Sequence, residues 1–378
     1  MDLDKSEIMC IFALEVCKTK MRRKILLILF VLVVSFQLLP GGGDLYAQHV
    51  YPVVGKVLYA LSAKVSYSVS GVFYIAGILV LLLYPIYAIV KHKQRKLDVF
   101  WMELELVAWL YVWFYGAWGL NYCQSDFYQR TSTPRANYDV AALVRFADDY
   151  VTKLNESYVE IKKVDEALVR QEVAKQYAKM GKGMGIHTPF SEQPREKTML
   201  LTPLASMVGV TGTMGPFFGE FIVNGDLLPC EYAAAYAHEL SHLLGITSEG
   251  EANFYGYLAC TSSDVPEIRF SGYLSILHHV LRAMREAGRE EYNLIHTKIR
   301  PEIHMLELER RVHWVSLYSE TLGEMQDKIF DFYLRSNRIE EGRKSYSSVF
   351  GLLISCECYK QPWKGEKTTD GGKTPGNE

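Results

Sequence analysis

The residues best suited to chemistry in this sequence are two histidines and a glutamate within one short stretch. His238 and His242 are four residues apart and Glu239 follows the first of them, which gives the pattern H-E-x-x-H. Residues four apart share one face of a helix, so both imidazoles can bind the same ion. The pattern predicts a single zinc ion, Zn2+, with His238 and His242 as ligands and Glu239 as the general base that deprotonates a metal-activated water.

The residues around this pattern favour the helix that the chemistry requires. Residues 232–237 read Tyr-Ala-Ala-Ala-Tyr-Ala and are good helix formers, and Gly245 follows where a helix end is expected. We therefore expect one helix that begins after Pro229 and carries both histidines. The alternative interpretation is a pair of surface histidines with no metal.

A hydrolytic zinc ion needs a third protein ligand and one open position. No histidine follows Gly245 at the metzincin spacing, so a glutamate on the next helix is the expected donor, and Glu249 and Glu251 are the candidates. We predict Glu251 as the ligand. Its alternative role is that of a helix cap, because Ser248 and Glu251 form a capping box. Glu249 is interpreted as a solvated acid of the first turn.

Other side chains are predicted to support this site. Asn253 is expected to orient a metal ligand. The segment 219–223, which includes Gly219 and Glu220, is predicted to be a strand that pairs with an extended peptide substrate, or alternatively part of an ordinary core hairpin. Candidates for stabilising an oxyanion are Tyr255, Tyr257 and Tyr273, while His278 and His279 are interpreted as structural or as a remote alternative.

The composition excludes several other classes of protein. Lys and Arg number 41 against 43 Asp and Glu, so no basic excess is available for nucleic acid. The seven cysteines contain no C-x-x-C pair, which argues against a disulfide framework or a zinc ribbon. No P-loop, Rossmann or G-x-S-x-G pattern competes with the histidine motif.

Three apolar runs near the N-terminus predict membrane spans at about 24–40, 71–90 and 100–120. Basic residues at 22–24 and 91–96 mark cytoplasmic ends, which directs the chain after about residue 121 to the periplasmic side of a bacterial inner membrane. The first run is alternatively a cleaved signal peptide. The third is alternatively a buried amphipathic helix.

These segments define the predicted domain organisation. The fold class is mainly α, with transmembrane helices followed by a mostly helical zincin-like domain that has a small β-hairpin or sheet beside the active-site helix. The predicted parts are an N-terminal extension at 1–21 (with Met21 as an alternative start), a membrane region at 22–120, an extracytoplasmic metallopeptidase-like domain at 121–360 and a disordered tail at 361–378.

Over most of residues 22–355 the chain resembles a family of three-span bacterial membrane proteins known as domain of unknown function 3810. The matching pieces include Trp118–Tyr122, Phe218–Glu220, the motif His238–His242 with Gly245, and the segment from Glu251 to Cys260. The family is viewed as gluzincin-like. That resemblance implies His238, His242 and Glu251 as metal ligands and Glu239 as the catalytic carboxylate.

The expected function is therefore that of a membrane-anchored zinc metallopeptidase that hydrolyses peptide or protein substrates. Its expected partners are that substrate and the lipid bilayer, with no nucleic acid. The alternative is a catalytically inactive membrane sensor or assembly protein that retains a structural metal site.

Overall fold

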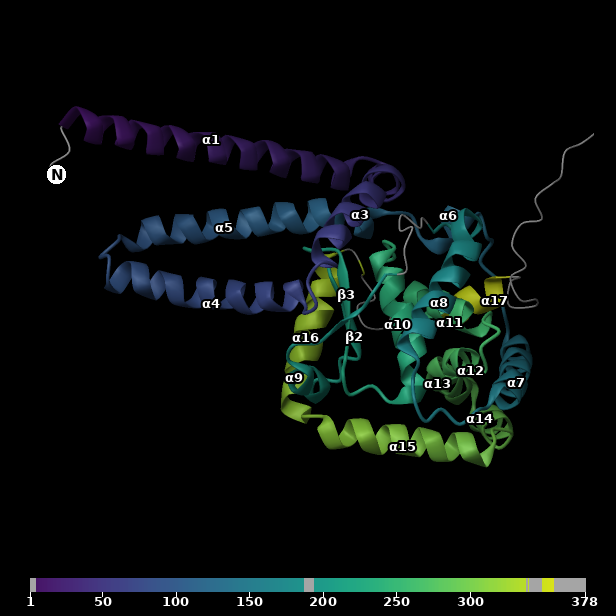
Figure 1. The fold of residues 1–378 in the computed structure, drawn as a ribbon. Helices are drawn as coiled ribbons and strands as arrows, with labels where there is room; N and C mark the ends of the chain where they lie inside the picture. The colour runs from purple at the N-terminus through teal and green to yellow at the C-terminus, as the bar shows by residue number, and fades with distance from the viewer. Residues whose placement is uncertain (1–4, 187–193, 338, 340–348, 357–378) are drawn as a thin grey trace, which may run out of the picture. The chain divides into compact units, whose positions relative to one another are not determined.

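A computed structural model describes residues 5–186, 194–337, 339 and 349–356 (Figure 1). The described chain is mainly helical, as predicted, and contains three short strands. It divides into two compact units, the first being Met1–Gln124 with Gly215–Glu220 and the second Ser125–Met214 with Phe221–Glu378. The tail predicted to be disordered, residues 361–378, lies outside the described residues.

The first unit consists of helices and the middle of a β-hairpin. The helix α1 ends at Leu38, and Gly41 then adopts a left-handed conformation with φ of 74° that turns the chain into the next helix. The helices of this unit are α1 Lys5–Leu38, α2 Gly42–Leu45, η1 Tyr46–Val50, α3 Tyr51–Ser62, α4 Val69–Val90, α5 Lys96–Ala117 and η2 Gly119–Cys123.

One helix of the described chain, α4, is long and apolar enough by itself to cross a membrane, and it matches the predicted span at 71–90. The predicted span at 24–40 lies in α1, which qualifies only as part of a broken pair, Thr19–Leu38 with Gly42–Ser62, bent by 114°. The predicted span at 100–120 corresponds to α5, which is long enough but not apolar enough to count as a candidate span. Its glutamates lower its hydropathy, and one of them, Glu105, forms ion pairs with Arg22 and Arg23.

The second unit is a helical domain with a small sheet. Its core is formed by α10, α11 and α12, which pack against one another, with α7 and α8 beside them (Figure 1). Its helices are α6 Phe127–Thr131, α7 Val140–Ser157, α8 Glu166–Met180, η3 Gly181–Met184, α9 Thr202–Met207, α10 Pro229–Leu243, α11 Glu249–Thr261, α12 Pro266–Ser275, α13 Leu277–Ala287, α14 Arg289–His296, α15 Pro301–Leu317, α16 Glu320–Ser336 and α17 Val349–Ser355.

Two glycines allow the three core helices to pack at short range. A Cβ at Gly256 of α11 would lie 3.2 Å from the backbone nitrogen of His238 on α10. A Cβ at Gly272 of α12 would lie 2.5 Å from Cβ of Cys260 on α11. Any side chain at these positions would therefore separate the helices. This packing brings the backbone of α11 directly against the first histidine of the motif.

The sheet has the strand order β1-β3-β2, with β1 at Lys197–Thr198, β2 at Gly212–Gly215 and β3 at Glu220–Val223. The strands β1 and β3 are parallel, with Lys197 opposite Ile222 and Thr198 opposite Val223. The predicted strand at 219–223 is thus β3. Because β3 is the central strand, its two edges are both paired, and β2 is an edge strand.

Candidate metal centre

The motif His238–His242 lies on one helix, α10, as predicted. The helix begins at Pro229, and the backbone N–H of Leu228 donates to the Glu231 carboxylate at 3.1 Å, which caps its first turn. The helix ends before Gly245, whose φ of 93° lies in the left-handed region that glycine adopts without strain. The chain then turns back into α11, which packs antiparallel to α10.

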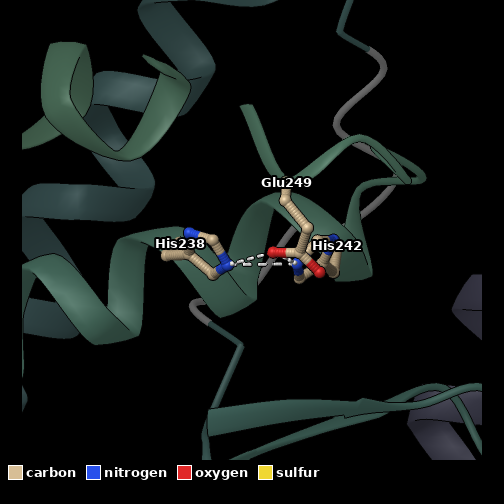
Figure 2. Close-up of side chains that lie close together, drawn as sticks. All are labelled: His238, His242 and Glu249. Carbon is tan, nitrogen blue, oxygen red and sulfur yellow. Dashed lines mark hydrogen bonds and ion pairs between the residues drawn. The ribbon is translucent and has the colours of Figure 1, made fainter. Parts of the chain in front are cut away.

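The structure groups Glu249 of α11 with the two histidines (Figure 2). Glu249 Oε2 lies 3.2 Å from His238 Nε2 and 3.6 Å from His242 Nε2, and the two Nε2 atoms are 3.2 Å apart. All three side chains point to a common centre between the two helices. Among the described residues, these three form the one group of histidine, cysteine or acidic side chains close enough together to hold a metal ion.

Glu251, which was predicted as the third donor, lies elsewhere. Its carboxylate forms an ion pair with the guanidinium of Arg130 and accepts a hydrogen bond from the backbone N–H of Phe127 at 2.9 Å, both from α6. Ser248 caps the helix by accepting from the backbone N–H of Glu251 at 3.4 Å. Successive helix positions are rotated by about 100°, so residues two apart face nearly opposite directions. The structure thus places Glu249, and not the predicted Glu251, beside the two histidines.

The sequence contained a signal for this choice. Asn253, predicted to orient a ligand, is four residues after Glu249, and Gly256 is seven residues after it. These three positions share one helix face. A helix whose Asn253 faces a histidine of α10 must therefore direct Glu249 to the same side and Glu251 away from it.

Hydrogen bonds fix the orientation of both imidazole rings. His242 Nδ1 lies 2.7 Å from the backbone carbonyl oxygen of Ile246, which can only accept, so Nδ1 carries the proton. His238 Nδ1 lies 2.9 Å from Oδ1 of Asn253, which holds that ring in the same tautomer. In both rings Nε2 is then the atom directed at the centre of the cluster. This is the arrangement that partner groups impose on metal-binding histidines.

The donor set fits a tetrahedral zinc ion. Donor atoms about 2.0–2.2 Å from such an ion lie about 3.3–3.6 Å from one another. The three separations in the cluster are 3.2, 3.2 and 3.6 Å. Two imidazole nitrogens and one carboxylate oxygen are also the ligands of a hydrolytic zinc site. His238, His242 and Glu249 would therefore hold the ion.

The cluster shifts the pKa values of its own members. Burial by itself would lower the pKa of His242, but the negative charge of Glu249 outweighs burial and raises it to about 9. Burial by itself would raise the pKa of Glu249, but the two imidazoles bring it below its ordinary value. In the absence of an ion, positive charge is thus held among the three side chains by protons. A divalent cation would meet the same electrostatic demand.

Glu239 lies on the same helix but does not join the donor cluster. Its side chain is buried, and its Oε2 atom has no hydrogen-bond partner in the described structure. Burial raises the pKa of Glu239, partly offset by the nearby histidines. The carboxylate packs against β2, where a Cβ on Gly212 would lie 2.4 Å from Oε1. No local sequence pattern indicated Gly212, because this contact depends on how the sheet packs on α10.

The contacts described for the other predicted candidates lie outside the cluster, except that His279 is close enough to His238 for their charges to interact. The Tyr255 hydroxyl donates to the backbone oxygen of Met184 at 2.6 Å and accepts from Arg130, so it belongs to the Glu251 network. The rings of Tyr257 and Tyr273 pack against each other. Gly219 and Glu220 belong to the first unit. His279 is buried beside His278, and its pKa is lowered to about 3 by burial and by nearby positive groups.

These features define a helical protein with one helix able to cross a membrane and a His-His-Glu cluster on two adjacent helices. A family described as proteins of unknown function, DUF3810, matches residues 46–354, and the chain belongs to this family. The match confirms the family resemblance and begins after α1. No curated protein and no solved structure matches the chain.

Proposed function

We propose that this protein is a membrane-anchored zinc metallopeptidase in which His238, His242 and Glu249 hold the metal ion and Glu239 is the general base. One observation carries the proposal. Three donor atoms of the kinds that bind zinc converge at the spacing of a tetrahedral site, and a buried carboxylate without a hydrogen-bond partner lies on the same helix. A structural role for Glu239 would leave that unpartnered oxygen unexplained.

The chemistry assigns a separate task to each side chain. A zinc ion held there supplies a Lewis acid that activates water and polarises the substrate carbonyl. Asn253 and the Ile246 carbonyl keep both imidazoles turned with Nε2 towards the centre. Glu239 accepts a proton from the attacking water and delivers it to the leaving amine. The buried surroundings of Glu239 raise its proton affinity, which suits a group that holds the proton between the two steps.

The neighbouring strand supports a peptide substrate. The edge strand of the sheet beside Glu239 is β2, with Gly212 directly against the carboxylate. An edge strand offers backbone N–H and C=O groups to an extended peptide. We therefore propose β2, and not the predicted segment 219–223, as the strand that pairs with substrate. That segment is the central strand β3, and both of its edges are already paired.

The proposed membrane location is supported by α4 together with the charges after it. The helix α4 is long and apolar enough to span a bilayer, and basic residues at 91–96 follow its C-terminal end. With these basic residues on the cytoplasmic side, the proposed periplasmic location of the second unit in a bacterial inner membrane requires α5, which packs against α4, to return the chain across the bilayer.

A second candidate function is that of a membrane sensor or assembly protein with a structural metal site. The burial of the cluster favours it, since His242 is 7% exposed and Glu249 is 9% exposed. Structural zinc sites are closed to solvent, whereas catalytic sites keep one position open. The two functions make different predictions for Glu239, which a structural site does not need.

Purified full-length protein, reconstituted in lipid, tests the proposal. We expect about one zinc per chain by elemental analysis and cleavage of a mixture of unstructured peptides. Glu239→Gln should keep the zinc and lose the cleavage, whereas His238→Ala should lose both. Glu267→Gln, a change of the same kind at an exposed position on α12, is the matched control and should alter neither.

Two results would decide against a peptidase. Zinc-free protein after preparation in zinc-containing buffer would contradict the metal site itself. Stoichiometric zinc with no difference between wild type and Glu239→Gln in any peptide would favour the structural metal site.

A further inference from the structure

The β2–β3 hairpin, residues 212–223, touches the proposed catalytic base at one end. A Cβ at Gly212 would lie 2.4 Å from Oε1 and 2.6 Å from Cδ of Glu239. At this distance the strand backbone is in van der Waals contact with the carboxylate. A small movement of β2 would therefore change the space available to the Glu239 side chain.

The middle of the hairpin belongs to the first unit, where a buried carboxylate attaches it to α4. Glu220 Oε1 accepts hydrogen bonds from the Ser68 hydroxyl at 3.0 Å and from the backbone N–H of Ser70 at 2.6 Å. Ser68 is the N-cap residue of α4. The negative charge of Glu220 thus lies at the N-terminus of that helix, where unpaired N–H groups and the helix dipole favour an anion. All three residues are fully buried.

Two further attachments hold the turn of the hairpin. The indole N–H of Trp113 on α5 donates to the backbone oxygen of Phe217 at 3.0 Å. The ring of Phe73 on α4 lies 5.0 Å from the ring of Phe217 and 5.2 Å from that of Phe218. Gly219 has a φ of 59°, and a Cβ there would lie 2.9 Å from Cβ of Leu58 on α3. Polar and aromatic contacts from α4 and α5, together with close packing on α3, therefore fix the turn.

A two-stranded hairpin is only marginally stable unless other elements hold it. In this protein the strand in contact with Glu239 continues directly into a turn held by α4 and α5. We propose that Glu220 and Trp113 are positioning residues, through which the helices α4 and α5 set the position of β2 and thereby the activity of Glu239. The proposal rests on the proposed peptidase function, and it adds that the membrane region regulates the site.

The experiment uses the full-length protein in lipid nanodiscs and compares Glu220→Ala and Trp113→Phe with wild type. Two substitutions on α5 serve as matched controls, Glu103→Ala and Trp101→Phe, since neither side chain holds the hairpin. Hydrogen exchange of the amides at 212–215, zinc content, kcat and KM are measured for each protein.

We expect amide exchange at 212–215 to rise about tenfold or more in Glu220→Ala, which removes hydrogen bonds to a charged group, and about fivefold in Trp113→Phe. Zinc content should stay at the wild-type value, because the donors lie on α10 and α11. We expect kcat to fall with little change in KM. Glu220→Gln, which keeps the accepting oxygen, should recover part of the loss.

The outcomes separate this inference from the proposed function. Unchanged exchange at 212–215 in both variants would overturn the inference, even in an active enzyme. Increased exchange with unchanged kcat would overturn it as well. A wild-type protein without peptidase activity would contradict the proposed function, and the exchange data would still decide whether Glu220 and Trp113 hold the hairpin. If Glu220→Ala fails to fold, Trp113→Phe alone carries the test.

Discussion

Two carboxylates of the same helix have opposite surroundings. Glu249 faces two imidazoles across the gap between α11 and α10, while Glu251 faces the guanidinium of Arg130 on α6. Both are buried, and they are two residues apart in the sequence. The difference arises only from the helix face on which each residue lies.

The comparison shows what makes a buried acid available to a metal. A guanidinium stays protonated at any working pH and occupies the carboxylate that it faces. Imidazole nitrogens lose their protons and become ligands themselves. Glu251 is therefore already neutralised by a permanent cation, whereas Glu249 shares its site with groups that exchange a proton for an ion. The first arrangement stabilises the fold, and the second suits the proposed zinc ion.

The largest difference is expected from Glu249→Ala against Glu251→Ala in zinc retention. Removing one of three side chains that bind the metal directly should lower zinc affinity by more than about 100-fold. Loss of a residue that only hydrogen-bonds to a ligand already costs about 10–100-fold. Glu251→Ala should retain about one zinc per chain, because its carboxylate lies with Arg130. Competition with a chromogenic chelator measures both affinities. The assignment of the ligand would be wrong if Glu251→Ala lost zinc and Glu249→Ala kept it.

The second difference concerns the free energy of unfolding. Here Glu251→Ala is expected to have the larger effect and Glu249→Ala the smaller. Glu251→Ala leaves Arg130 charged and buried without its ion-pair partner, which should lower the free energy of unfolding of the second unit by about 3–5 kcal/mol. In zinc-free protein Glu249→Ala should cost less, because it removes a carboxylate whose partners can become neutral. Denaturant unfolding of zinc-free protein, followed by circular dichroism, tests this order.

The exposed Glu267→Ala is the control for that experiment and should change stability by no more than about 0.5 kcal/mol. If Glu249→Ala and Glu251→Ala lowered the free energy of unfolding equally, the proposed difference between the surroundings of the two carboxylates would be wrong.

Much of the helix α10 could be predicted from the sequence because its determinants are local. The spacing of His238 and His242 and the glycine at 245 specify a helix, its end and the face that carries both histidines. The faces of α11 were also available from periodicity, through Asn253 and Gly256. The alternative role of Glu251 in a capping box is met only in part, since Ser248 accepts from the backbone N–H of Glu251 while the Glu251 side chain bonds to α6 and not to its own helix.

Contacts between distant segments could not be predicted in this way. Arg130 is 121 residues from Glu251, and no local rule pairs them. Gly212 and Glu239 meet only after the sheet packs on α10. The helix α5 was predicted as a span from its apolar run, but Glu105 in this helix forms ion pairs with Arg22 and Arg23 of α1. Apolar composition alone does not distinguish these roles.

The smallest expected effect concerns Asn253, which lies on the Glu249 face of α11. Its Oδ1 is 2.9 Å from His238 Nδ1 and holds the ring for metal binding. Asn253→Ala should lower zinc affinity by about 10–100-fold, as is usual when the partner of a metal-binding histidine is removed. Asn253→Asp should restore most of that affinity, because a carboxylate oxygen accepts the same hydrogen bond.

Chelator competition on both variants measures this effect, with Glu251→Gln as the control on the opposite face. A loss of zinc affinity in Glu251→Gln equal to that in Asn253→Ala would show that general disturbance of α11 weakens binding. A loss confined to Asn253→Ala would attribute it to the orientation of His238, because only that variant removes a group in contact with a metal ligand.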